Sequence, residues 1–180
     1  MPDVLTHLAT GHWAGRLLAG RQPARQRRLA LLLAALTGAA LPDLLTRVPS
    51  LLLSERVDGI GSFVAPLHCP LPYLLACALL SRTFVEELRA PVFAGLAIGG
   101  LIHLAADLGQ RNLRSLYMVF FPFTASGYQL GLYEPEASVR WAPAFLAASA
   151  ALEIVLYVSR RVVRCQNRKK PIPEPPLASR

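Results

Sequence analysis

The sequence contains few charged residues, and acidic residues are the scarcer kind. Only 17% of its 180 residues are charged, with 11 Asp or Glu against 19 Lys or Arg. An average soluble domain carries about 25% charged residues. Hydrophobic residues make up 53% of the chain and the mean hydropathy is +0.39, which is typical of an integral membrane protein.

Cysteine is also scarce, with Cys69, Cys77 and Cys165 forming neither an even set nor a CxxC pair. This argues against a disulfide framework and against a zinc site of the CxxC type. The first basic cluster follows the first apolar stretch, the reverse of the order in signal peptides, so no cleavable signal is expected. The sequence contains no internal repeat.

The net charge of +8 has a distribution that argues against a nucleic-acid partner. The basic residues form short blocks beside apolar runs, without interleaved aromatic residues or a nucleic-acid-binding motif. Such blocks set membrane topology or meet anionic lipid headgroups. The latter role is expected for the basic, proline-rich tail at 161–180, which is predicted to be disordered and cytoplasmic.

The apolar runs predict an all-α polytopic membrane helix bundle with about five spans in a single domain at 1–160. The predicted spans are Val4–Gly20, Leu29–Thr46, Ser62–Ser81, Ala90–Ala106 and Trp141–Ser159. Ser115–Tyr133 is interrupted by proline and glycine and is predicted to be re-entrant or interfacial, because a sixth span would place the basic cluster after Arg160 outside.

This topology follows the positive-inside rule, with Met1 outside and Arg180 inside. It places 14 of the 19 basic residues on the inner side, including the block Arg21–Arg28. Glu153 lies about 18 Å into the last run, and Arg16 lies at a similar depth in the first. We expect these two residues to pair, because an unpartnered charge is costly there.

His103 and Asp107 are one turn apart in an apolar run and therefore leave the same helix face. Such a pair grips one metal ion, or the carboxylate orients the imidazole. Two hydrogen-bonded polar groups without a ligand are the alternative. The predicted topology brings His7, Asp43 and His68 to the same outer level, so that five potential ligands gather there. Two histidines with carboxylates and an open position describe a catalytic site for zinc or a similar divalent ion, in which bound water becomes a nucleophile.

Other polar residues have weaker claims to this site. His12 lies about 140° around the helix from His7 and is expected to be a packing or interface residue. Glu134 and Glu136 are expected to be solvated, with a role as general base or extra ligand as the alternative. Cys69 is expected to be a small buried residue rather than a soft ligand.

The order of five motifs resembles the YdjM-like family of bacterial membrane-bound, metal-dependent hydrolases. The motifs are THLATG at Thr6–Gly11, GAALPDLL at Gly38–Leu45, LHCPLP at Leu67–Pro72, GGLIHLAAD at Gly99–Asp107 and FFPFTASGYQLGL at Phe120–Leu132. The helical HxxxD is similar, more distantly, to that of zinc-dependent phospholipases C. The sequence departs from the family pattern where Asp43 lacks a following Asp and His, and where Pro72 and Tyr73 stand in place of a second His.

The resemblance implies a metal set of His7, Asp43, His68, His103 and Asp107, with Asp43 and Asp107 in catalytic roles. A bacterial inner-membrane, multi-pass hydrolase is the leading interpretation. It would act at the outer face on an ester or phosphoester, either a membrane lipid or a small phosphoester. The alternatives are a metal-handling or small-solute transporter and a structural helix bundle.

Overall fold

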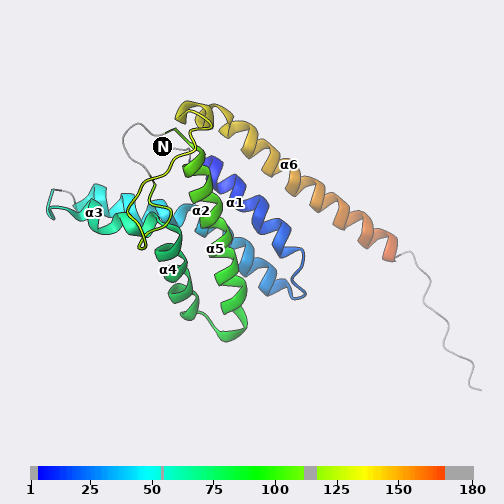
Figure 1. The fold of residues 1–180 in the computed structure, drawn as a ribbon. Helices are drawn as coiled ribbons and strands as arrows, with labels where there is room; N and C mark the ends of the chain where they lie inside the picture. The colour runs from blue at the N-terminus through cyan, green and yellow to red at the C-terminus, as the bar shows by residue number, and fades with distance from the viewer. Residues whose placement is uncertain (1–3, 54, 112–116, 169–180) are drawn as a thin grey trace, which may run out of the picture.

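The computed structural model describes residues 4–53, 55–111 and 117–168, and every regular element within them is a helix. The elements are α1 (Val4–Ala19), α2 (Arg25–Leu53), α3 (Ile60–Val64), the 3-10 helix η1 (Ala65–His68), α4 (Pro70–Arg82), α5 (Glu86–Gly109) and α6 (Pro135–Arg168). Two isolated β-bridges, but no strand, occur in these ranges. The all-α prediction is confirmed, and Figure 1 shows the other helices arranged around α2 and α5.

Three helices are long and apolar enough to cross a membrane, namely α2, α5 and the Pro135–Val162 part of α6. A fourth crossing is formed if α3, η1 and α4 count as one span. The 16 residues of α1 measure about 24 Å, which is shorter than a hydrocarbon core of about 30 Å. The predicted count of about five spans is therefore not confirmed, because the described helices supply three or four candidates.

The predicted third span, Ser62–Ser81, is broken rather than straight. An 82° bend separates α3 and η1 from α4. At the break Cys69 has an extended backbone, and Pro70 opens α4. Proline has no N–H and removes a hydrogen bond from a helix that precedes it, but it fits the first turn of a new one. The bend places His68, the last residue of η1, beside α5.

The contact between α2 and α5 is made backbone to backbone through glycines. A Cβ built on Gly38 would collide with the Leu96 carbonyl, and one built on Gly99 would collide with the Ala35 carbonyl. Gly95 and Gly99 form the small-xxx-small pattern by which membrane helices approach closely. The contact of α1 with α2 uses two further glycines, Gly11 and Gly15.

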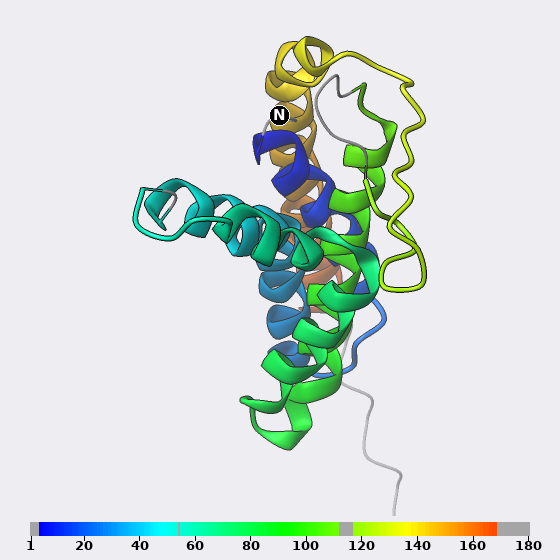
Figure 2. The ribbon, with the colours of Figure 1, turned by 60° about the vertical axis from the view of Figure 1, so that its left-hand side comes forward.

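Helix α2 changes direction along its length. It contains Pro42 and Pro49, and a proline inside a helix removes a backbone hydrogen bond and bends the helix. Figure 2 shows the C-terminal part of α2 and α3 extending sideways as an arm, away from α1 and α5. The predicted second span, Leu29–Thr46, thus includes the part of α2 that precedes this arm.

Helix α6 packs mainly against α1 and presents most of its surface outward. Only 6% of its candidate span is buried. Trp13 and Phe145 stack between the two helices with ring centroids 5.1 Å apart. The helix continues to Arg168, past the predicted start of the tail at 161, in a sequence whose Arg and Gln residues are good helix formers. Residues 169–180 lie outside the described ranges.

The predicted re-entrant or interfacial segment, Ser115–Tyr133, is described from residue 117 and forms no helix. Its end returns along the C-terminus of α5. The amides of Leu130 and Leu132 donate to the carbonyls of Leu108 and Gly109 at 2.9 and 2.7 Å. Because the last carbonyls of a helix have no donor within it, this segment satisfies them and closes the end of α5.

Candidate metal centre

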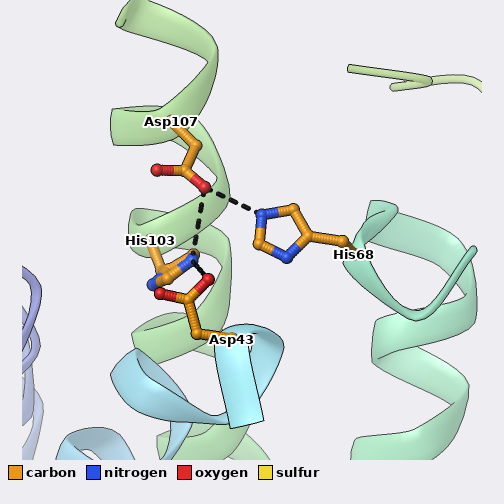
Figure 3. Close-up of side chains that lie close together, drawn as sticks. All are labelled: Asp43, His68, His103 and Asp107. Atoms are coloured by element: carbon orange, nitrogen blue, oxygen red, sulfur yellow. Dashed lines mark hydrogen bonds and ion pairs between the residues drawn. The ribbon is translucent and has the colours of Figure 1, made fainter. Parts of the chain in front are cut away.

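Four polar side chains from three elements meet near the C-terminal end of α5 (Figure 3). Asp43 comes from α2, His68 ends η1, and His103 and Asp107 lie one turn apart in α5. One ligand atom of each lies within 4.8 Å of one atom from each of the others. We call these four residues the His/Asp cluster. Its nitrogen and oxygen donors could hold one metal ion.

The carboxylate of Asp107 lies at the centre of three imidazole rings and is fully buried. His68 Nε2 lies 2.8 Å from Asp107 Oδ2, and His103 Nε2 lies 3.4 Å from the same oxygen. His7 Nε2, from α1, lies 3.5 Å from Asp107 Oδ1, and its ring centroid is 4.0 Å from that of His103. The structure therefore brings all five predicted residues together, with His7 adjoining the His/Asp cluster. Their role as ligands stays a prediction.

A turn of α2 next to Pro42 holds His103. Because proline has no N–H, Gly38 O has no donor within α2. The neighbouring carbonyl of Ala39 accepts a hydrogen bond from His103 Nδ1–H at 2.8 Å. This bond fixes the ring, so that Nε2 carries the lone pair. The lone pair faces Asp43 Oδ1 at 3.7 Å as well as the carboxylate of Asp107.

Several buried polar atoms of this site have no hydrogen-bond partner. They are His103 Nε2, both ring nitrogens of His7, Asp43 Oδ1 and Asp107 Oδ1. Burying such atoms unsatisfied is costly, and a lone pair facing anionic oxygens is repelled by them. A cation between His103 Nε2 and the carboxylate oxygens of Asp43 and Asp107 would remove both penalties for these atoms. The residues present therefore fit a divalent metal ion.

Arg47 supplies a positive charge at the edge of the site. Its Nε lies 2.6 Å from Asp43 Oδ1, one turn along α2. The two groups form an ion pair, but their geometry is not that of a hydrogen bond. The arginine is partly exposed, whereas Asp107 is fully buried. Arg47 thus offsets one of the two carboxylates and leaves a net negative charge with neutral imidazoles, which again suits a cation.

Tyr73 supports the site, and sequence reasoning missed this role. Its side chain is fully buried, and its hydroxyl lies 2.7 Å from Leu96 O and 3.2 Å from Gly38 O. It thereby fastens α4 to both α5 and α2 and occupies the carbonyl that Pro42 leaves without a helical donor. The signal was available, because a tyrosine in a buried apolar run needs a hydrogen-bond partner.

A second polar group joins α1 to α6, and the predicted pairing of Arg16 with Glu153 is confirmed. The Arg16 guanidinium donates to both carboxylate oxygens of Glu153 through Nε and Nη2. His12 Nε2 lies 2.7 Å from Glu153 Oε1. We call these three residues the ion-pair triad. His12 is thus an interface residue on the opposite side of α1 from His7, and its partner is a carboxylate.

The weaker candidates lie outside the His/Asp cluster. Glu134 pairs with Arg111 at 3.0 Å, and both side chains are more than half exposed. Glu136 lies in the first turn of α6, where a negative charge is favourable. Cys69 is buried, with its Sγ 3.9 Å from Ala65 O.

Tyr133 closes the end of α5 beside the site. Its hydroxyl donates to the carbonyl of Ala106 in the last turn of the helix. Burial raises the pKa of Tyr133, and the negative charge of Asp107 raises it further. The phenol is therefore a neutral donor at physiological pH.

The comparisons with known proteins identify one family. The model of the YdjM inner membrane protein family matches residues 1–169, which confirms the resemblance carried by the motifs. They do not show the more distant similarity to zinc-dependent phospholipases C. No curated protein and no solved structure matches the chain. The predicted inner-membrane localisation is confirmed by the family, and the three long apolar helices agree with it.

Proposed function

The chain belongs to the YdjM inner membrane protein family, and from this premise we propose that it is a metal-dependent hydrolase of an ester or phosphoester at the outer face of the membrane. The observation that carries the proposal is the buried lone pair of His103. Its Nε2 lies 3.4 and 3.7 Å from the carboxylates of Asp107 and Asp43 and has no hydrogen-bond partner. A divalent cation between the two carboxylates would partner this nitrogen, which no donor among the described residues does.

Zinc is the proposed metal, because it accepts imidazole nitrogens and carboxylate oxygens in four-coordinate sites. His7, His68, His103 and Asp107 would hold the ion, and Asp43 would serve as a further ligand or as general base. The Ala39 carbonyl keeps His103 in the required tautomer, as outer-shell partners of metal-binding histidines commonly do.

A bound divalent ion supplies a nucleophile from water near neutral pH and polarises a substrate oxygen. With an ion bound, Asp43 would be the carboxylate that accepts a proton, because its side chain is more exposed than that of Asp107. Arg47 orients it through their ion pair. Asp107 is the fully buried anion that holds three imidazoles around one point.

The outward orientation of the site is part of the proposal. The turn between α1 and α2, the turn between α4 and α5 and the C-terminal end of α6 lie toward the end of the molecule opposite the cluster (Figure 1). These three regions carry Arg21–Arg28, Arg82 with Arg89, and the basic residues from Arg160. Basic segments stay on the cytoplasmic side, so the cluster faces outward. The five-span topology and the contact of the basic tail with anionic headgroups follow from the same orientation.

Hydrolysis by detergent-purified protein tests the proposal. The probes are bis(p-nitrophenyl) phosphate and p-nitrophenyl butyrate, assayed before and after chelation and after zinc is restored. We expect turnover that is lost on chelation, recovered with zinc and absent from His103→Ala. The matched control is Glu153→Gln, which changes a membrane carboxylate outside the site and keeps turnover. If the wild type retains its metal but hydrolyses the probes no faster than His103→Ala does, the protein handles metal without hydrolysis.

A further inference from the structure

A mostly apolar pocket of about 220 Å³ opens beside the His/Asp cluster. One wall is a face of α5 formed by Leu101, Ala105 and Leu108, which repeat at helical spacing. The opposite wall includes Met118, from the segment that closes the end of α5. Functional pockets for small molecules measure about 300–1,000 Å³, so this one suits part of a molecule rather than a whole one.

His68 belongs both to the pocket and to the His/Asp cluster. Its ring lines the pocket, and its Nε2 lies 2.8 Å from Asp107 Oδ2. The ring of Tyr117 stacks on the pocket side of His68 with centroids 6.0 Å apart. A ligand in the pocket would therefore end at His68, within reach of the proposed metal site.

The pocket lies at membrane depth. Its α5 wall belongs to a candidate membrane span, Glu86–Gly109, and extends from Leu101 to Leu108, which is about 10 Å of helix. Leu101 and Ala105 are exposed, so this face of α5 meets the bilayer rather than another described helix. In a membrane, acyl chains surround such a face.

We propose that the pocket binds an acyl chain of a membrane lipid and thereby presents the bond that links the chain to its headgroup to the His/Asp cluster. This inference rests on the proposed function and selects lipid, rather than a small phosphoester, as the substrate class. The apolar lining matches the chain, because van der Waals packing, rather than transfer from water, stabilises apolar contacts inside a membrane. His68 marks the boundary at which the apolar chain ends and the polar bond begins.

Photolabelling in lipid nanodiscs tests this inference without requiring turnover. The probe is phosphatidylethanolamine with a diazirine on one acyl chain, and labelled residues are mapped by mass spectrometry. We expect labels concentrated on 101–108 and 117–119. Ala105→Trp places an indole in the pocket and should remove most of that labelling, because the ring takes the volume that the chain would occupy. Leu101→Trp, farther from the cluster, should lower it as well.

The matched control is Ala147→Trp, at an exposed position in the candidate span of α6. It should leave labelling of the pocket unchanged. Equal labelling of the pocket and of the α6 surface, unaffected by Ala105→Trp and Leu101→Trp, would overturn the proposal. Metal analysis of the same samples separates the two claims. If His103→Ala loses metal but keeps pocket labelling, the metal site and the acyl-chain site are both supported. If the wild type retains metal but its pocket is not labelled, only the acyl-chain site is contradicted.

Discussion

The His/Asp cluster and the ion-pair triad both place histidine and carboxylate side chains among apolar helices, but their charges are satisfied differently. In the triad, Glu153 receives two hydrogen bonds from the guanidinium of Arg16 and one contact from His12, whose Nδ1 has no hydrogen-bond partner. In the cluster, Asp107 is surrounded by three imidazoles, and several nitrogen and oxygen atoms remain unpartnered.

The difference distinguishes a helix clamp from a ligand site. Arginine is permanently charged and has several donors in a fixed geometry, so it neutralises a carboxylate without help from a ligand. Histidine carries no permanent charge, and in the cluster His103 Nε2 faces both carboxylates without a hydrogen-bond partner. Polar groups in membrane helices are thus informative through the balance of donors and acceptors around them, and not through their presence alone.

Asp107→Asn should have the largest effect on metal binding. It keeps the shape of the side chain but removes the charge that lies between three imidazoles. We expect zinc affinity to fall by about 100-fold or more, beyond the 10–100-fold cost of losing an outer-shell partner. Competition with a fluorescent chelator measures this change. Glu153→Gln should bind zinc as the wild type does; an equal loss in both variants would erase the distinction between cluster and triad.

Glu153→Gln should instead affect stability. The change leaves Arg16 without its anionic partner, and hydrogen bonds to charged groups contribute about 1.5–3 kcal/mol. We expect the free energy of unfolding in detergent to fall by about that amount, with α6 separating from α1 before the core unfolds. A double-mutant cycle with Arg16→Met measures the coupling. A coupling energy near zero would show that the triad does not hold α6.

The local part of the site could be predicted from the sequence, whereas its supports could not. His103 and Asp107 share a helix face by spacing alone, and Arg16 and Glu153 could be paired by depth. The contact of His68 with Asp107 depends on the 82° bend. No periodicity encodes that angle, because Ser62–Ser81 has the composition of one continuous span.

The role of Pro42 was likewise hidden. A Pro-Asp pair marks the end of an apolar run, but the hydrogen bond from His103 to Ala39 depends on how closely α2 and α5 approach. That distance is set by glycines on both helices, and it is a property of the pair rather than of either sequence segment. Tyr73 was missed for the same reason, because both of its acceptors lie on other helices.

Gly99→Ala tests whether this close approach positions the cluster. The added Cβ meets the Ala35 carbonyl, so α2 and α5 must separate. Overpacking of this kind costs about 1–3 kcal/mol, and zinc affinity should fall with stability because Asp43 moves away from His103. Gly20→Ala is the matched control, since its Cβ would meet nothing closer than 3.6 Å. Unchanged zinc binding in a destabilised Gly99→Ala protein would separate the helix contact from the site.

Tyr73→Phe should have the smallest effect. It removes one hydroxyl whose acceptors are Leu96 O and Gly38 O and keeps the ring against Gly100. A single buried hydrogen bond contributes about 1 kcal/mol. Thermal unfolding with and without zinc should show a similar loss in both conditions, because Tyr73 touches the helices and not the ion. A loss confined to the zinc-bound protein would place its hydroxyl in the metal site.

Elemental analysis of the detergent-purified wild-type chain tests the central claim most directly. The protein is stripped with chelator, refilled with zinc, desalted and analysed together with Asp107→Asn and Glu153→Gln. The cluster geometry predicts close to one zinc per chain in the wild type and in Glu153→Gln, and none in Asp107→Asn. Wild-type protein that retains no divalent ion after refilling, or equal retention in all three proteins, would contradict a metal centre at Asp43, His68, His103 and Asp107.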